Sequence, residues 1–289
     1  MTRVRRFRDL AGARVFVTGA ASGIGRAVAE QAAAQGAVLH LTDVQAEPLA
    51  EVAERLHARW AEPVDLADHD AVVATTDPLT AEHGSMDIVL NVAGISRWGT
   101  VTGLEHDDWR RLVDVNLMGP IRVIERLVPP MVDAGRGGHL VNVSSAAGII
   151  GMPWHAAYSA SKFGLRGVSE VLRFDLRRHG IGVSLVVPGG VATPLTETVQ
   201  IAGVDRQGEA FRRAHAGFRR RAVTPEQAAT AIWDGVRHGR YWVYTSPDVR
   251  AIHALQCWAP PVYVLAMRAM SAGAHRVLPE VERARRSDL

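Results

Sequence analysis

The 289-residue chain carries 33 Lys and Arg residues against 30 Asp and Glu residues, which leaves a formal charge of +3. With 47% hydrophobic and 22% charged residues, it has the composition of a globular domain and gives little support to nucleic-acid binding. The single cysteine, Cys257, excludes an internal disulfide and fits a reducing, cytoplasmic compartment. The sequence also predicts no signal peptide, no membrane-spanning segment and no metal site.

Short apolar runs rich in β-branched residues alternate with helical patterns along the chain. Strands are predicted at residues 14–18, 38–42, 87–92, 139–144, 182–188 and 241–245, with a further short run ending at Val64. Helices are predicted after the first strand and at 45–58, 68–83, 107–134, 159–179 and 225–238. This alternation predicts an α/β fold with a parallel sheet covered on both faces. Residues 1–245 are expected to form one domain and residues 246–289 a C-terminal extension.

A glycine-rich segment, TGAASGIG at residues 18–25, lies between the first predicted strand and the helix that follows. Its glycines allow a tight turn and a close approach to a bound pyrophosphate, and the free N–H groups of the helix attract the phosphate charge. A merely structural turn is the alternative, but the position between strand and helix favours dinucleotide binding. The predicted contacts here are Gly19, Ser22, Gly23, Ile24 and Gly25.

Asp43 follows the second predicted strand, where a carboxylate can accept hydrogen bonds from the adenosine ribose and repel a 2′-phosphate. Neither neighbour, Thr42 or Val44, is basic, which favours NAD over NADP. Arg26 is close in sequence and would weaken that preference. The alternative interpretation is a loop carboxylate that points into water.

Lys162 is the only lysine of the chain, and it lies four residues after Tyr158. Positions i and i+4 share one helix face, so the phenol and the ammonium can face the same cleft. A nearby cation lowers the pKa of a phenol, ordinarily about 10, and would let Tyr158 exchange a proton with an alcohol or carbonyl. The compact lysine head also suits two ribose hydroxyls better than the planar fork of arginine. The alternative is a lysine on a solvated helix face.

Three further motifs accompany the glycine loop: NVAG at 91–94, YSASK at 158–162 and PGGVATP at 188–194. In order and spacing, from about Gly12 to Thr245, these segments resemble the short-chain dehydrogenase/reductase family. Val92 departs from the pattern, because the family often has Asn there. The resemblance implies a Rossmann-like, doubly wound parallel sheet of about seven strands in a single domain, assembled as a homodimer or homotetramer.

The resemblance also implies roles for individual residues. The implied catalytic residues are Tyr158 as acid/base, Lys162 as its partner and ribose ligand, Ser145 on the reacting oxygen with Ser144 the lesser candidate, and Asn116 holding a backbone kink and a water. Further implied cofactor contacts are Asp43, Asp65, Leu66, Asn91, Ala93, Gly94, Tyr158, Lys162, Pro188, Val191 and Thr193, with Asp65 at the adenine and the last two at the nicotinamide amide.

Loops at the carboxyl ends of the strands are expected to bind the substrate. Their apolar residues favour a bulky hydrophobic alcohol or ketone, although the same residues could pack among themselves. The expected substrate contacts are Ser145, Trp98, Trp154 and Tyr158, with Met152 and His155 on the same loops and a lid at about residues 194–222.

Two segments leave several interpretations open. The Arg-rich run at 211–221 could attract an acidic substrate or an anionic membrane, or it could form a solvated helix face. The apolar run at 257–270 is too short to span a bilayer. It could cover a pocket, meet a partner subunit or lie on a membrane surface, and packing against the protein is favoured.

The sequence therefore predicts an oxidoreductase that transfers a hydride between NAD(H) and a bulky secondary alcohol or ketone. An NADP-dependent ketoreductase of the same fold and a nucleotide-binding sensor without turnover are the alternatives. A membrane-surface binding module, resting on the tail and the Arg-rich run alone, is a third.

Overall fold

A seven-stranded parallel sheet forms the centre of the molecule in the computed structural model, which describes residues 4–205, 207–279 and 281. Its strand order is β3-β2-β1-β4-β6-β7-β9. The strands are β1 (Arg14–Thr18), β2 (Val38–Asp43), β3 (Trp60–Pro63), β4 (Ile88–Asn91), β6 (Gly138–Val143), β7 (Ile181–Val187) and β9 (Trp242–Tyr244). The predicted single-domain α/β fold with about seven parallel strands is confirmed.

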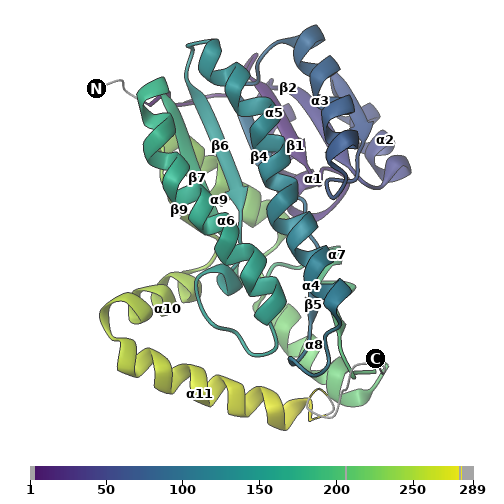
Figure 1. The fold of residues 1–289 in the computed structure, drawn as a ribbon, viewed down its shortest axis with the longest axis vertical. Coiled ribbons are helices and arrows are strands. Elements are labelled where there is room, and N and C mark those ends of the chain that lie inside the picture. Colours follow the sequence, from purple (N-terminus) through teal and green to yellow (C-terminus); the bar gives the residue numbers. More distant parts are fainter. Residues whose placement is uncertain (1–3, 206, 280, 282–289) are drawn as a thin grey trace.

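Helices cover both faces of this sheet (Figure 1). One face carries α1 (Gly23–Ala33), α2 (Ala46–Arg55) and α9 (Pro225–His238), and the other carries α3 (His69–His83), α4 (His106–Val113), α5 (Gly119–Asp133) and α6 (Ala156–Asp175). All seven residues of β7 are buried. Strands covered on both faces are continuous apolar runs, which is why the sequence pattern located them.

The chain order reverses between β1 and β4, because β2 and β3 lie on one side of β1 and the later strands on the other. The loops that leave β1 and β4 therefore diverge at the carboxyl edge of the sheet. In open α/β sheets this divergence leaves a crevice where ligands bind.

Two helix boundaries differ from the prediction. The helix predicted at 107–134 is interrupted by a π-helical turn, Asp114–Met118, between α4 and α5. The helix predicted from Ser159 begins at Ala156, so Tyr158 lies in its first turn, and it passes into a 3-10 turn at Leu176–His179. A two-stranded sheet of β5 (Arg97–Trp98) and β8 (Gln200–Ile201) was not predicted, since such short strands carry no periodicity.

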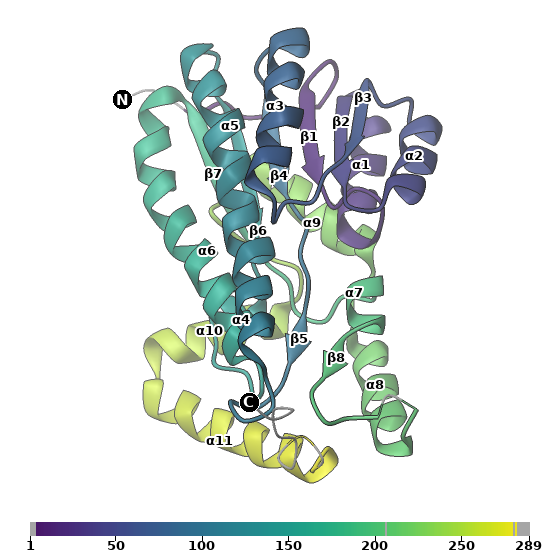
Figure 2. The same cartoon turned by 45° about the vertical axis from the view of Figure 1, so that its right-hand side comes forward.

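The predicted lid region contains α7 (Pro194–Glu197), β8 and α8 (Glu209–Arg221), which lie beside one another in Figure 2. The extension forms α10 (Pro247–Trp258) and α11 (Pro260–Val277), and α11 crosses the base of the molecule in both ribbon views. Val249 packs into an apolar cluster with the ends of β7 and β9. Residues 280 and 282–289 of the predicted extension lie outside the described residues.

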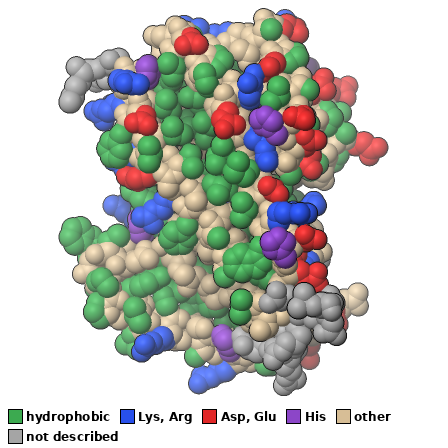
Figure 3. All heavy atoms as spheres, viewed as in Figure 1, with side chains coloured by type: hydrophobic (Ala, Val, Ile, Leu, Met, Phe, Trp, Pro, Cys, Tyr) green, Lys and Arg blue, Asp and Glu red, His purple; other side chains and the backbone are tan. Residues whose placement is uncertain are grey.

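Hydrophobic side chains remain exposed on these two helices, and the face in Figure 3 shows many of them around α10 and α11. Trp258 is 88% exposed and Leu265 67% exposed, and no residue of α11 is buried. Within the described part of the chain, no helix has the length and hydrophobicity needed to cross a membrane.

Candidate active site

A cavity of about 700 Å³ opens at the carboxyl edge of the sheet. Except for Asn91, the predicted cofactor contacts all line it, namely Gly19, Ser22, Gly23, Ile24, Gly25, Asp43, Asp65, Leu66, Ala93, Gly94, Tyr158, Lys162, Pro188, Val191 and Thr193. Ser145 and Trp98 line the same cavity. The fold thus brings together segments that are far apart in the sequence.

Two glycines of the glycine loop lie too close to neighbouring backbone to be replaced by residues with a side chain. A Cβ on Gly25 would lie 2.0 Å from the Gly19 carbonyl oxygen, and one on Gly19 would lie 2.8 Å from Ala93 Cα. Gly19 also has a φ of +68°, which L side chains rarely adopt. Ser22 makes no capping hydrogen bond at the start of α1, so the first N–H groups of this helix are available to a phosphate.

Asp43 is fixed at the edge of the cavity rather than directed into water. Its side chain is buried, and its carboxylate accepts hydrogen bonds from the backbone N–H groups of Ala21 at 3.1 Å and Gln45 at 3.0 Å. Arg26 does not line the cavity, and its Nε donates to Glu30 Oε1 at 2.9 Å. The interpretation of Asp43 as a solvated loop carboxylate is therefore wrong.

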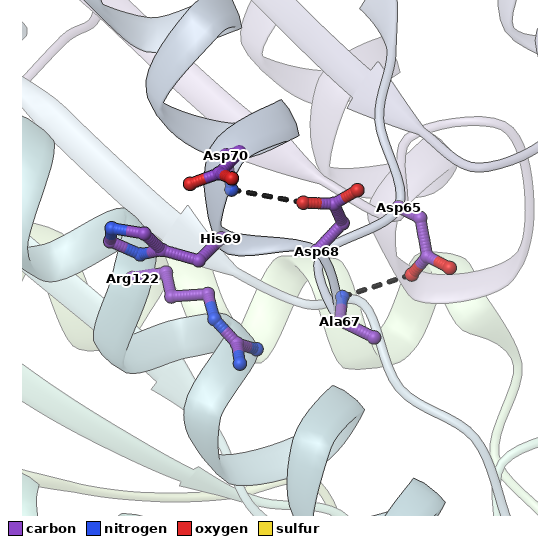
Figure 4. A pocket seen from close by; sticks show the side chains of 6 residues that line it. All are labelled: Asp65, Ala67, Asp68, His69, Asp70 and Arg122. Carbon is purple, nitrogen blue, oxygen red and sulfur yellow. Dashed lines mark hydrogen bonds between the residues drawn. The ribbon is translucent and has the colours of Figure 1, made fainter.

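Asp65 borders the same cavity on the loop after β3. Its carboxylate accepts a hydrogen bond from the Ala67 N–H at 2.9 Å, as Figure 4 shows. The neighbouring Asp68 accepts from the N–H groups of Asp70 and Ala71 and so caps α3. The acidic residues of this loop thus fix the chain's entry into α3.

Asn91 lies inside the sheet and not on the cavity wall. Its side chain is 1% exposed and donates to Asn142 Oδ1 at 2.9 Å, which links β4 to β6. The side chain of Asn91 therefore contacts the neighbouring strand, and the adenosine-side contact stays a prediction for this residue. Thr18 Oγ1 accepts from the N–H groups of Val92 and Ala93 at 3.0 and 3.1 Å and orients the loop that follows.

Tyr158 is buried, and it lines the cavity together with Ser145. Burial raises the pKa of Tyr158 above its ordinary 10, and the hydrogen bond from Ser145 opposes that rise. The expectation of a lowered phenol pKa is therefore wrong for the described chain, because loss of hydration outweighs the stabilising contacts. Ser144 and Ser145 both line the cavity, but the Ser144 hydroxyl donates to the Lys162 carbonyl at 3.0 Å and is therefore held by α6.

Lys162 reaches from α6 toward the end of β6. Its side chain is buried, and Nζ donates to the Val143 carbonyl at 3.0 Å. Burial lowers the pKa of Lys162 to about 8. The ammonium and the phenol ring border one cavity, as the spacing of four residues predicted.

Asn116 lies in the π-helical turn, in agreement with the backbone irregularity implied by the family resemblance. Its Oδ1 accepts from the Ile95 N–H at 2.8 Å and its Nδ2 donates to the Ile95 carbonyl at 2.9 Å. Asn116 does not line the cavity. It holds the loop with Gly94, where an added Cβ would lie 3.0 Å from Asn116 Oδ1 and 3.4 Å from Lys162 Nζ.

The substrate side differs from the prediction at Trp154. This side chain does not line the cavity and instead packs against a cluster with Ile201, Phe211 and Leu278. Its neighbour His155 does line the cavity. Apolar lining residues that sequence reasoning missed are Ile95, Val115, Ile150, Val199, Val249, Ile252 and Met270. The last three belong to the extension, for which pocket covering was one of three interpretations.

Among the described residues, no group of His, Cys, Asp and Glu side chains is arranged to hold a metal ion. The polar side chains that line this cavity carry hydroxyl, imidazole, ammonium, guanidinium, carboxylate and amide groups.

Comparison with known proteins gives a consistent set of relatives. The family described as short chain dehydrogenase matches residues 13–202. SadH of Mycobacterium tuberculosis, named as an oxidoreductase, is 36% identical over 248 residues, covering 83% of this chain and 88% of that protein. The trans-4-hydroxycyclohexanecarboxylate dehydrogenase of Sinomonas cyclohexanicum is 32% identical over 191 residues, covering 63% and 73%. A crystal structure of a short chain dehydrogenase/reductase from Burkholderia phymatum in complex with NAD superposes with a TM-score of 0.77 at 26% identity, covering 88% of this chain and 96% of that one.

Proposed function

The chain belongs to the short chain dehydrogenase family, and from that premise we propose that this enzyme transfers a hydride between NAD(H) and a bulky, hydrophobic secondary alcohol or ketone. The observation that carries the proposal is a single cavity whose wall includes the glycine loop and Asp43 together with Ser145 and Tyr158. A dinucleotide site and a proton-transfer site are thus adjacent.

The residues present fit a nicotinamide dinucleotide. The glycine loop forms a backbone cradle that a Cβ would fill, and α1 offers its N-terminal N–H groups to the pyrophosphate. Asp43 would hold the adenosine ribose, and Lys162 the ribose next to the nicotinamide. When bound, the dinucleotide would supply the acceptor or donor of the hydride.

The preference for NAD over NADP rests on Asp43. Its carboxylate is held by two backbone N–H groups, and a 2′-phosphate next to it would meet a fixed negative charge. Arg26, the nearest arginine in the loop, is engaged by Glu30. The relative from Burkholderia phymatum that was solved with NAD supports the same choice.

Tyr158 is proposed to move the proton. In reduction its hydroxyl donates a hydrogen bond and then a proton to the carbonyl oxygen, and in oxidation it takes the proton from the alcohol. Ser145 holds the reacting oxygen against Tyr158, and the positive charge of Lys162 stabilises the phenolate. Positioned acid–base catalysis of this kind contributes about 10² to 10⁴ in rate.

The apolar lining of the substrate side supports a hydrophobic substrate. Ile150 and Val249 are buried in the cluster that closes this end of the cavity, and the extension contributes Ile252 and Met270. Burial of apolar surface contributes about 25 cal/mol per Å² to binding, so a small polar alcohol would gain little here.

A panel of aromatic and alicyclic ketones and secondary alcohols tests the proposal, with turnover followed by nicotinamide absorbance using both dinucleotides. We expect turnover with NAD(H) and at least a 10-fold lower kcat/KM with NADP(H), since a repelled phosphate costs more than about 1.4 kcal/mol. Binding of NAD without turnover of any member of the panel would instead support the nucleotide-sensor alternative.

A further inference from the structure

His155 occupies a position in the cavity that the proposed chemistry leaves unused. It is the residue before α6 and lies one helical turn ahead of Tyr158, so both side chains are on one face of the helix. It is 6% exposed, and the surface it retains contributes to the cavity wall. Its ring centre is 6.1 Å from that of Tyr158.

The hydrogen-bonding state of His155 is fixed by its neighbours. Nδ1 lies 2.5 Å from the Pro153 carbonyl oxygen, and because a carbonyl can only accept, Nδ1 carries the hydrogen. Nε2 of the neutral ring therefore presents a lone pair. The Trp98 ring lies against the imidazole with 4.2 Å between ring centres and a tilt of 36°, and its own N–H donates to Ser96 Oγ at 2.7 Å.

Within the described residues, Nε2 of His155 has no hydrogen-bond partner, and it is not among the polar atoms sealed in the interior. The acceptor therefore opens into the cavity. Burial lowers the pKa of His155 to about 4, so the ring stays neutral in neutral solution and accepts hydrogen bonds without taking a proton.

Other hydroxyls on this side of the cavity are already in use. Thr196 Oγ1 lies 3.0 Å from the Val191 carbonyl and 2.8 Å from the Thr193 carbonyl, which share its one hydrogen, and Thr198 donates to the Pro194 carbonyl. The remaining walls are mostly apolar. A buried acceptor among apolar groups penalises a ligand that leaves it unpaired and selects one with a donor at that point.

We propose that His155 Nε2 accepts a hydrogen bond from a second hydroxyl on the substrate, and that the enzyme is selective for apolar diols and hydroxyketones. This inference rests on the proposed function. The reacting oxygen contacts Ser145 and Tyr158, while the second hydroxyl, close to the reacting carbon, contacts His155. The rest of the substrate lies against the apolar wall.

Three matched probes test the selectivity: benzoin, deoxybenzoin, which lacks the hydroxyl, and benzoin methyl ether, which cannot donate. Each is titrated calorimetrically into the NAD-loaded full-length protein, and kcat/KM is measured with NADH. We expect wild type to bind benzoin at least about 10-fold more tightly than the other two, the effect of one hydrogen bond to a buried acceptor. The same ratio is expected in kcat/KM.

Two variants test whether His155 causes the preference for benzoin over the other two probes. His155→Phe keeps a ring against Trp98 but removes the acceptor, and it should abolish the preference while leaving deoxybenzoin binding within about 3-fold, since apolar packing is retained. His155→Gln returns an acceptor and should restore part of the preference. NAD affinity, measured for each variant, confirms an intact fold.

Equal affinity of wild type for the three probes, a preference that survives His155→Phe, or no binding of any probe would overturn the inference. Failure of the proposed function has a different outcome, because the calorimetric preference for benzoin would then be present while no probe is turned over. Turnover of all three ketones at equal rates would retain the function and overturn the selectivity.

Discussion

Lys162 Nζ lies 5.9 Å from the centre of the Tyr158 ring and 3.0 Å from the Val143 carbonyl oxygen that accepts its hydrogen bond. The ammonium is therefore anchored to the end of β6 while it faces the ring one turn away on α6. At this distance in a buried site, a charge interacts with a developing phenolate far more strongly than in water. Lys162 thus links the end of β6 to α6 next to Tyr158, where the proposed proton transfer takes place.

Tyr158→Phe should lower kcat by at least about 100-fold, because the ring and its packing remain but the transferable proton is lost. NAD affinity should stay within about 3-fold of wild type, since the hydroxyl makes no contribution to the backbone cradle. Turnover followed at 340 nm and NAD binding by calorimetry measure the two effects. Retained turnover would show that another group carries the proton.

Lys162→Arg should reduce both turnover and NAD affinity, although the charge is kept. The side chain is 3% exposed, and the longer, planar guanidinium cannot place a donor where Nζ now meets the Val143 carbonyl at 3.0 Å. We expect kcat/KM to fall about 100-fold or more, a loss of about 3 kcal/mol. Arg166→Lys, the reverse exchange one turn further along α6, is the matched control and should keep wild-type kinetics. Wild-type kinetics in Lys162→Arg would mean that charge alone suffices.

The sequence predicted the structure best in two kinds of segment: strands that are buried on both faces, and loop positions where there is no space for a side chain. Strands such as β7 are uninterrupted apolar runs, and the glycine loop requires Gly at positions where a Cβ would collide with backbone. Both features are local consequences of packing, so they could be predicted from the residues alone.

Contacts between distant segments could not be predicted in this way. The cavity wall receives Val249 and Met270 from the extension, and nothing in their local sequence distinguishes them from other apolar residues of that segment. Trp154 and His155 are adjacent, yet only His155 lines the cavity, because Trp154 has a φ of +63° and packs against the cluster with Leu278. The raised pKa of Tyr158 likewise depends on burial that only the fold reveals.

Asp43→Ser should shift the dinucleotide preference toward NADP. The substitution removes the fixed negative charge that we propose lies next to the ribose 2′ position, while a serine hydroxyl can still accept the Ala21 N–H. The ratio of kcat/KM values for NADPH over NADH should rise about 10-fold or more, which corresponds to about 1.4 kcal/mol. Asp248→Ser, which changes an exposed carboxylate of α10 that also lines the cavity, is the control and should leave the ratio unchanged. An unchanged ratio in Asp43→Ser would remove the basis for the NAD preference.

Gly25→Ala should eliminate NAD binding and destabilise the fold. The added Cβ would lie 2.0 Å from the Gly19 carbonyl oxygen, and neither backbone segment can retreat without opening the loop. Gly167→Ala is the matched control, because a Cβ there meets nothing within 4 Å and alanine favours a helix interior by about 1 kcal/mol. Thermal unfolding should therefore show a loss of stability in Gly25→Ala and a gain in Gly167→Ala. NAD titration should show a loss of affinity in Gly25→Ala only. Full NAD affinity in Gly25→Ala would argue against a tight backbone cradle.

His139→Gln should make the protein less sensitive to acid. His139 is fully buried between strands, and its Nε2 lies 2.8 Å from Ser184 Oγ, which itself donates to the Arg240 carbonyl at 2.6 Å. Nε2 therefore carries the hydrogen, and glutamine can supply an N–H in its place. Burial lowers the pKa of His139 from 6.5 to about 4.

Between pH 6.5 and about pH 4, the unfolded chain binds a proton at His139 that the folded chain does not bind. The free energy of unfolding therefore falls as the pH falls through this range. For this residue the loss between pH 7 and pH 5 is about 2 kcal/mol, and Gln, which does not titrate, should remove that share of the pH dependence. Urea unfolding at the two pH values measures it, with His106→Gln on the surface as control. Because His40, whose pKa is also lowered to about 4, titrates by the same mechanism, some acid sensitivity should remain in His139→Gln. An identical loss of stability in wild type and His139→Gln would mean that His139 takes up its proton in the folded state as readily as in the unfolded chain.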